Sequence, residues 1–383
     1  MTLFPRFVRK TKGIMGRVRA ALAPRAPRPA SNAATINLAA PDIARDPFPH
    51  YEDLRRSGSV QFLARHNAWI VLGYEQVLSA FGHPLLFSNR PYADVDAVLL
   101  AADPPEHTAI RRLVSAYFSR DVVERLGAFA AERAAALIKP RFDVVRDYGQ
   151  PLSQGVAAHL LGFDDATVEE IRGASARSVD FAQYILEIDA LADRASMYSR
   201  LRADGLDDGR ARSLVRLFWV ASTNTTERVI AQCVMLLLRH AEVRAAIERD
   251  LGLIGPFIEE VMRLHQPEPM LRRWTTQQVE LGGAHIPAGS DVYLCLAAAN
   301  RDTAMYQQPA ELRLDRTTSR HLTFGAGIHH CIGATLARAE LTAAVRALLV
   351  HAPAFRAAQP LESVRYCATM MAHYIESLVV DAP

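Results

Sequence analysis

The chain has 383 residues, half of which are hydrophobic, and carries a formal net charge of +3. This length and apolar content allow a sizeable buried core and exclude a single small module. The cysteines lie far apart without a CxxC pair, so the sequence predicts no disulfide framework, and no stretch reaches the roughly 18 uninterrupted apolar residues of a membrane span.

The first 40 residues differ from the rest of the chain in charge, because they contain basic residues and no acidic one. Apolar residues recur there at helical spacing over residues 3–22, which predicts a basic amphipathic helix on an anionic membrane surface. A disordered tail and an organelle transit peptide are the alternative interpretations. Pro24, Pro27 and Pro29 then indicate a linker. We therefore expect an extension over residues 1–40 and one folded domain over residues 41–383.

Helical periodicity dominates the expected domain, and strands are short. Helices are expected at residues 49–57, 74–81, 106–118, 121–138, 151–161, 165–186, 207–239, 256–264 and 332–349. Strands are expected at residues 60–63, 68–71, 279–281, 291–294 and 376–380. This pattern predicts a mainly α fold with small β-sheets, and periodicity alone defines it no further than α+β.

The most informative segment is Phe-Gly-Ala-Gly-Ile-His-His-Cys-Ile-Gly at residues 324–333. Its glycines allow tight turns and a close approach to a flat, bulky group, and Cys331 stands where a helix start favours a thiolate. One cysteine with no second cysteine nearby cannot complete a tetrahedral zinc or iron–sulfur site. It can serve as the single axial ligand of a haem.

This segment resembles the ligand loop of the cytochrome P-450 family, Phe-Gly-x-Gly-x-His-x-Cys-x-Gly, at every defined position. The resemblance implies a haem b, iron protoporphyrin IX, with the Cys331 thiolate as its axial ligand. It also implies that Phe324 packs near the sulfur and that His329 donates to a haem propionate. The family's fold is a single triangular, helix-rich domain, so residues 41–383 are expected to be a catalytic domain of this type.

A second match lies on the expected helix at residues 256–264, where Glu260 and Arg263 share one face. This pair resembles the family's Glu-x-x-Arg, and Arg316 is the expected third member of the group. The implied role is structural. In isolation, such a pair would indicate only a solvated contact on a helix surface.

Haem propionates need cations and hydrogen-bond donors, and the family order implies where they lie. His107 and Arg111 are one helical turn apart, and Arg273 matches another propionate-binding position, with Arg272 as its rival. The alternative for each of these residues is an ordinary surface charge.

The expected helix at residues 207–239 contains Ala-Ser-Thr-Asn-Thr-Thr at 221–226, which partly matches the family's Ala-Gly-x-(Asp/Glu)-Thr-Thr. Thr225 keeps the alcohol implied in dioxygen activation, whereas Asn224 replaces the usual acid and Ser222 the usual glycine. An amide cannot relay a proton by ionising near neutral pH. Hydroxylation with protons from water or substrate therefore competes with desaturation, cyclisation or aryl coupling, and with peroxide-driven oxidation. Glu227 is interpreted as a helix-surface carboxylate.

The resemblance also implies a substrate pocket, lined by Phe218, Ala221, Ser222, Met270, Leu271 and Met370. Its apolar character predicts an apolar small molecule, with a natural-product intermediate of secondary metabolism as the expected class. Dioxygen and a ferredoxin-type electron donor with its reductase are the implied partners, and no nucleic acid is expected. We expect a cytoplasmic enzyme, peripheral to a membrane if residues 3–22 bind one. A haem-binding protein without catalytic activity is the alternative from another class.

Overall fold

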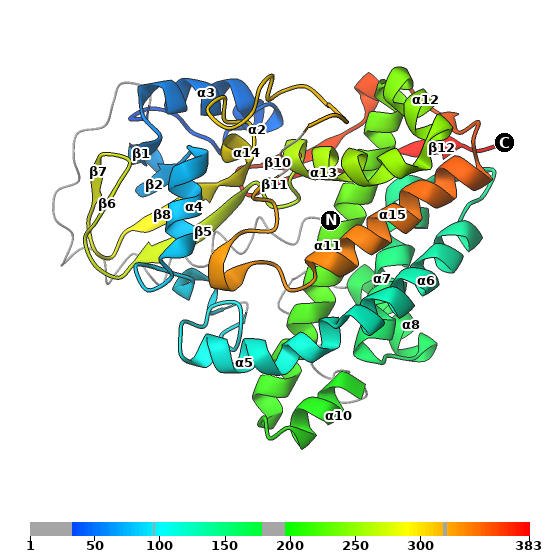
Figure 1. Ribbon diagram of the computed structural model, residues 1–383, viewed down its shortest axis with the longest axis horizontal. Helices are drawn as coiled ribbons and strands as arrows, with labels where there is room; N and C mark the ends of the chain where they lie inside the picture. The colour runs from blue at the N-terminus through cyan, green and yellow to red at the C-terminus, as the bar shows by residue number, and fades with distance from the viewer. Residues whose placement is uncertain (1–32, 95, 178–195, 317–319) are drawn as a thin grey trace.

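The computed structural model describes residues 33–94, 96–177, 196–316 and 320–383. Most helices gather on one side of the molecule, and the largest sheet lies on the other side, beside helices α3 (Phe48–Ser57) and α4 (Tyr74–Gly82) (Figure 1). The long helix α11 (Asp208–Arg239) runs through the middle and packs against α15 (Ala334–His351). The predicted fold class, mainly α with small sheets, is confirmed.

The remaining helices complete the helical side and the flanks of the sheet. They are α2 (Pro41–Arg45), α5 (Glu106–Val114), α6 (Arg120–Ala136), α7 (Gln150–Leu161), α8 (Asp165–Arg177), α10 (Ser196–Ala203), α12 (Ala241–Arg249), α13 (Ile254–Leu264) and α14 (Leu296–Ala299). Helix α11 begins at a defined cap, because Asp207 accepts a hydrogen bond from the Arg210 N–H at 2.9 Å. Its C-terminal half is buried on all sides and forms the centre of the core with α7, α13 and α15.

The largest sheet contains five strands in the order β1 (Val60–Leu63), β2 (Ala68–Val71), β8 (Asp291–Cys295), β5 (Met270–Thr275) and β3 (Phe87–Ser88). Only the pairing of β2 with β8 is parallel within it, and Met270 lies opposite Cys295 in the β5–β8 register. Two small hairpins pair β6 (Val279–Leu281) with β7 (Ala284–Ile286), and β10 (Tyr366–Thr369) with β11 (Ala372–Ile375). A separate three-stranded sheet joins β4 (Arg141–Asp143), β12 (Val379–Asp381) and β9 (Arg356–Ala357).

Several predicted bounds need correction. The strand predicted at residues 376–380 is interrupted, because β11 ends at Ile375, the Glu376 N–H donates to the Arg365 carbonyl, and β12 begins only at Val379. Strand β5 was not predicted, since Arg272 and Arg273 break its apolar alternation. The helix predicted at 165–186 ends at Arg177 within the described residues, and its remainder lies outside them.

The predicted extension over residues 1–40 lies largely outside the described residues, including the amphipathic helix expected at 3–22. Its last part is packed, however. Ala33 and Leu38 are each 1% exposed, and the Leu38 N–H donates to His66 Nε2 at 3.1 Å. Packed chain therefore begins before residue 41. Among the described residues, no helix is both long and apolar enough to cross a membrane.

Candidate functional site

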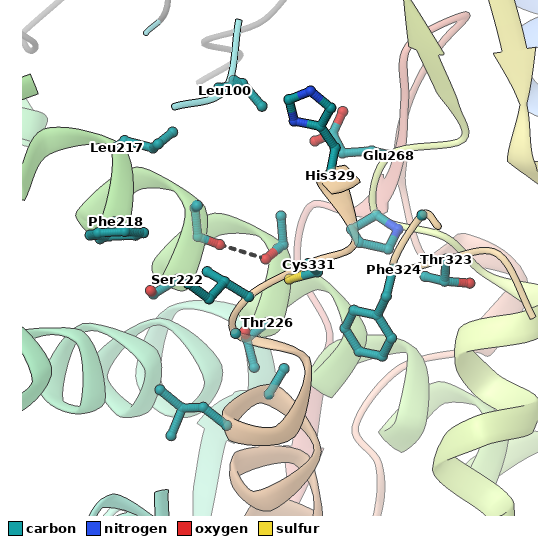
Figure 2. Close-up of a pocket in the computed structure, with 18 of the residues that line it drawn as sticks. Leu100, Leu217, Phe218, Ser222, Thr226, Glu268, Thr323, Phe324, His329 and Cys331 are labelled. Atoms are coloured by element: carbon teal, nitrogen blue, oxygen red, sulfur yellow. Dashed lines mark hydrogen bonds between the residues drawn. The ribbon is translucent and has the colours of Figure 1, made fainter. Parts of the chain in front are cut away.

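A cavity of about 300 Å³ lies between helix α11, the segment before helix α15 and the start of β5 (Figure 2). Its lining is mainly apolar. The lining includes His107, Arg111, Leu217, Phe218, Ala221, Ser222, Thr225, Thr226, Glu268, Leu271, Leu296, Phe324, His329, Cys331 and Glu340. The predicted ligand loop thus opens onto this cavity opposite helix α11.

The loop is held in shape by one short backbone contact and two left-handed glycines. The Cys331 N–H donates to the Phe324 carbonyl at 2.8 Å, and Gly325 and Gly327 have φ of 67° and 66°. A Cβ atom on Gly327 would lie 2.3 Å from the Phe81 carbonyl oxygen. Glycine is therefore required at Gly327 by conformation and by space.

Cys331 precedes helix α15 and presents its sulfur to the cavity, so its side chain is exposed although protein surrounds it on the other sides. Burial raises the pKa of the Cys331 thiol, while the Gly333 N–H, Arg111 and Arg338 partly offset this effect. The Arg338 guanidinium lies 4.5 Å from the centre of the Phe324 ring. A metal cation bound to the sulfur would strongly favour the deprotonated thiolate form of Cys331.

Two histidines and one arginine border the same cavity. The ring centres of His107 and His329 are 4.2 Å apart. Arg111 Nη2 donates to the His330 carbonyl at 2.6 Å. Both ring nitrogens of His107 and Nε2 of His329 are buried without a hydrogen-bond partner among the described residues. Burial, His107, Arg273 and Arg111 together lower the pKa of His329 to about 3. These orphaned nitrogens beside a cation fit the carboxylates of a haem, which would satisfy them.

Arg273 lies behind this group and does not line the cavity. It is 3% exposed, its Nη1 donates to the Arg272 carbonyl at 2.7 Å, and its guanidinium lies 5.2 Å from the centre of the Phe81 ring. Burial lowers its pKa to about 10. Arg272 instead pairs with Asp291 at 2.9 Å. Because Arg273 lowers the pKa of His329, it is the better placed of the two rivals.

One face of helix α11 forms the opposite wall. Phe218, Ala221 and Ser222, which were predicted for the substrate pocket, line the cavity together with Thr225, whose Oγ1 donates to the Ala221 carbonyl at 2.7 Å. Asn224 does not line the cavity, because its direction around the helix falls just outside this face. Its Oδ1 lies 3.4 Å from Thr223 Oγ1.

The two methionines predicted for the pocket lie elsewhere. Met270 is 0% exposed and Met370 is 7% exposed, and both belong to a core cluster with Leu38, Tyr51 and Cys295. Successive side chains of a strand point to opposite faces, so Leu271 reaches the cavity and Met270 points away from it. Met370 lies in the turn between β10 and β11.

Three carboxylates were missed or misread from the sequence, and two of them, Glu268 and Glu340, line the cavity. Glu340 is 2% exposed, accepts a hydrogen bond from Ser153 Oγ at 2.6 Å, and has its pKa raised by burial to about 8. Burial raises the pKa of Glu227 to about 7, which corrects its interpretation as a surface carboxylate. Glu268 pairs with Arg228 Nη1 at 3.0 Å. Glu340 could have been noticed from the sequence, because it is an acid on the apolar helix expected at 332–349. No comparable sequence pattern marks Glu268.

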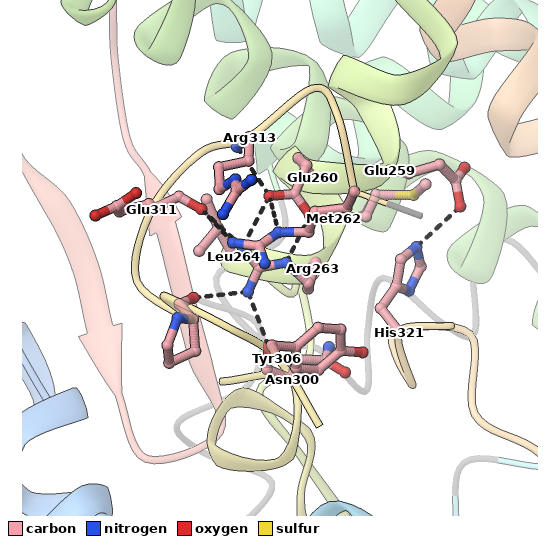
Figure 3. A network of polar contacts seen from close by, with 12 residues as sticks. Glu259, Glu260, Met262, Arg263, Leu264, Asn300, Tyr306, Glu311, Arg313 and His321 are labelled. Atoms are coloured by element: carbon pink, nitrogen blue, oxygen red, sulfur yellow. Dashed lines mark hydrogen bonds and ion pairs between the residues drawn. The ribbon is translucent and has the colours of Figure 1, made fainter. Parts of the chain in front are cut away.

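The predicted structural group forms one buried network near the start of the ligand loop (Figure 3). Arg263 is 0% exposed and its Nε donates to Glu260 Oε1 at 2.6 Å, while Arg316 Nε donates to Glu260 Oε2 at 2.8 Å. Arg263 Nη1 also donates to the Asn300 and Pro309 carbonyls at 3.0 and 2.7 Å. These contacts tie helix α13 to the chain that leads into the loop.

Comparisons with known proteins agree with this arrangement. The family model described as Cytochrome P-450 matches residues 162–351. The chain is 31% identical over 354 residues to the cytochrome P-450 monooxygenase PikC of Streptomyces venezuelae, covering 82% of this chain and 85% of that protein. It is 28% identical over 401 residues to the 6-deoxyerythronolide B hydroxylase of Saccharopolyspora erythraea, covering 89% and 98% of the two chains.

A solved cytochrome P-450 structure from Chondromyces apiculatus superposes with a TM-score of 0.82 at 26% identity, covering 91% of this chain and 98% of that chain. Fold and site together define a helix-rich haem enzyme with a cysteine-containing ligand loop. This chain belongs to the cytochrome P-450 family and is an enzyme of that type. Members of the family carry a haem with a cysteine thiolate ligand.

Proposed function

We propose that this protein is a haem-thiolate monooxygenase that oxidises an apolar small molecule, with Cys331 as the axial ligand of a haem b. The observation that carries this proposal is the position of the Cys331 sulfur, which opens onto an apolar cavity opposite the hydroxyl of Thr225. A haem held through a thiolate supplies the activation of dioxygen. The residues of the chain bind, orient and exclude water around it.

The edge of this site would hold the carboxylates of the haem. His107, Arg111 and His329 line the cavity, and Arg273 stands behind them. Neutral His329 donates an N–H, while the arginines supply positive charge and parallel donors. Phe324 packs between the cavity and Arg338 and shields the sulfur side of the loop. Glu260, Arg263 and Arg316 have a structural role, since their network anchors the preceding chain.

Helix α11 carries only part of the set of residues that delivers protons in the family. Thr225 supplies the hydroxyl, and Asn224 supplies an amide where the family has an acid. Because an amide does not ionise, water or the substrate delivers the proton that the acid would deliver. The same replacement favours, as second candidates, desaturation, cyclisation or aryl coupling, and peroxide-driven oxidation.

The substrate is a natural-product intermediate of secondary metabolism. The wall formed by Phe218, Ala221, Leu271 and Leu296 buries apolar surface. The relative from Saccharopolyspora erythraea is named for the hydroxylation of 6-deoxyerythronolide B, a natural product. This similarity supports the class of substrate and not its identity.

Electrons come from a ferredoxin-type donor with its reductase. Arg111 and Arg112 lie on helix α5, and Arg111 contacts the ligand loop directly through the His330 carbonyl. A basic surface at this point attracts an acidic carrier. The enzyme acts in the cytoplasm, and residues 3–22 give it peripheral contact with an anionic membrane.

Turnover under ¹⁸O₂ tests the proposal. The haem-loaded protein, a surrogate ferredoxin, its reductase and NADPH are incubated with a panel of natural-product intermediates, and products are analysed by mass spectrometry. We expect one ¹⁸O atom in the product. A product that has lost two hydrogens without gaining ¹⁸O would favour desaturation or coupling, and product formed only with added peroxide would favour the peroxide route. No product under any condition would contradict an oxidising enzyme.

A further inference from the structure

Glu268 places a carboxylate in the otherwise apolar part of the cavity wall. It lies between helix α13 and strand β5 and lines the cavity together with Leu271 and Leu296. Its side chain keeps 25% of its surface exposed. In Figure 2 it lies across the cavity from Leu217 and Phe218 of helix α11. The carboxylate is therefore within reach of a molecule that fills this space.

Arg228 fixes Glu268 from behind. This arginine belongs to helix α11, its side chain is 9% exposed, and its Nη1 lies 3.0 Å from Glu268 Oε1. Its guanidinium also lies 4.1 Å from the centre of the Tyr374 ring. Arg228 is not part of the cavity lining. Glu268 thus stands between the cation and the cavity, with a fixed orientation.

An ion pair at this partly buried position adds little to the stability of the fold, so its charge calls for another explanation. Burying an ion pair often stabilises a protein no more than apolar side chains of similar volume would. Burial raises the pKa of Glu268 to about 7, and Arg228 lowers it only in part. Tyr92 also faces Glu268, because the negative charge of Glu268 is one of the causes that raise the pKa of Tyr92. An additional hydrogen-bond donor would stabilise the carboxylate where one arginine does not suffice.

Glu268 is also the accessible carboxylate among the described lining residues. Glu340 lines the cavity too, but it is 2% exposed and already accepts the Ser153 hydroxyl. On the opposite wall, helix α11 contributes the hydroxyl groups of Ser222, Thr225 and Thr226. A substrate that extends away from helix α11 therefore meets Glu268 as its acceptor.

We propose that Glu268 is a specificity-determining residue that accepts a hydrogen bond from a hydroxyl group on an otherwise apolar substrate. This inference rests on the proposed function, since it places the substrate in the same cavity. A hydroxyl suits the site better than an ammonium group, because Arg228 already places a positive charge 3.0 Å from the carboxylate. A substrate carboxylate is disfavoured, because it would face a second anion without a proton or cation between them.

Matched probes of equal chain length test this preference in the haem-loaded protein. The probes are 1-dodecanol, its methyl ether and dodecanoate, and binding is followed by the change that each causes in the haem absorption spectrum. We expect the alcohol to bind about ten-fold more tightly than the ether, as is typical of a hydrogen bond to a charged group. Dodecanoate is expected to bind most weakly.

Three variants separate recognition from folding. Glu268→Leu is expected to abolish the preference for the alcohol and to leave binding of the ether unchanged or stronger. Because this change leaves Arg228 without its carboxylate, the double variant Glu268→Leu with Arg228→Leu is measured as well, and it should show the same loss. Glu280→Gln, an exposed acid on strand β6, is the control and should keep the wild-type ratio.

The outcomes are distinct from a failure of the proposed function. Each variant is first checked for the carbon monoxide difference spectrum of a haem-thiolate protein, so loss of the cofactor is recognised separately. A wild-type protein that binds alcohol and ether equally, or binds no probe, contradicts the role of Glu268. So does a Glu268→Leu variant that loads haem and retains the ten-fold preference.

Discussion

Asn224 and Thr225 are neighbours in sequence but take different positions around helix α11. Thr225 lines the cavity and donates its hydroxyl hydrogen to the Ala221 carbonyl, whereas Asn224 lies outside the lining. Direct contact between Asn224 and a substrate is therefore not expected. The effect of this residue on the reaction is expected to pass through proton delivery to Thr225 or to nearby water.

Asn224→Asp restores the acid that the family has at this position. We expect the rate of product formation to rise by roughly ten-fold, because a positioned acid can be reprotonated after it delivers a proton. Turnover with the surrogate donor measures this rate together with the electrons consumed per product. Asn37→Asp, which keeps an oxygen for the nearby Ala39 N–H, is the control and should change neither quantity. An unchanged rate in Asn224→Asp would show that proton delivery does not depend on this position.

Glu259 makes stability depend on pH in a direction that can be worked out. Burial raises its pKa, but hydrogen bonds from His321 and Arg338 outweigh this effect and lower it to about 2, from a usual 4.5. Ionised Glu259 therefore stabilises the fold fully above pH 4.5, and this stabilisation is lost as the pH falls toward 2. Arg338 lies over Phe324, so this contact also bears on the ligand loop.

Urea unfolding of wild type and Glu259→Gln checks this expectation at two pH values. Near pH 6 the variant should lose about 1–3 kcal/mol of unfolding free energy, because Arg338 and the buried His321 lose the carboxylate that accepts their hydrogen bonds. Near pH 3 the gap between the two proteins should narrow. An equal gap at both values would rule out an ionised Glu259 as its source.

The ligand loop is the element that depends most on backbone conformation. Gly327→Ala combines a left-handed φ with a Cβ placed 2.3 Å from the Phe81 carbonyl oxygen. We expect it to cost more than about 3 kcal/mol of unfolding free energy and to reduce haem retention.

Gly283→Ala is the matched control for that variant, since Gly283 has φ of 78° and open space around its missing Cβ. It should cost only about 1 kcal/mol. Urea unfolding and the haem-to-protein ratio measure both effects. Similar losses in the two variants would mean that φ strain, and not contact with Phe81, explains the glycine.

Elements with strong periodicity could be predicted from the sequence, and elements defined by distant partners could not. The span of α11 was predicted to within one residue at its start, because a long apolar stripe and Asp207 mark it. Strand β5 was missed, since its two arginines break the apolar alternation and the partner of Arg272, Asp291 on strand β8, is brought close only in the folded chain. Because strand β5 was not predicted, the alternation of its side chains was not available, and Met270 was wrongly placed in the pocket beside Leu271.

At the scale of the whole molecule, the resemblance indicated the family, the cysteine loop and the grouping of His107 with His329 at one edge of the cofactor, but not the contacts between segments that carry no motif. His107 and His329 are far apart in the chain, yet their rings lie 4.2 Å apart. The pair of Arg228 with Glu268 joins helix α11 to the segment before strand β5, and no local sequence pattern predicts it. Such contacts arise from packing, so no spacing rule predicts them.

The carbon monoxide difference spectrum of the reduced protein tests the central claim most directly. Wild type should show the band shift that is characteristic of a haem bound through a thiolate. Cys331→Ser should lose this shift, and Cys367→Ser, which alters a buried cysteine on strand β10, should keep it. A wild-type protein without the shift, or a Cys331→Ser variant that retains it, would contradict the assignment of Cys331 as the haem ligand.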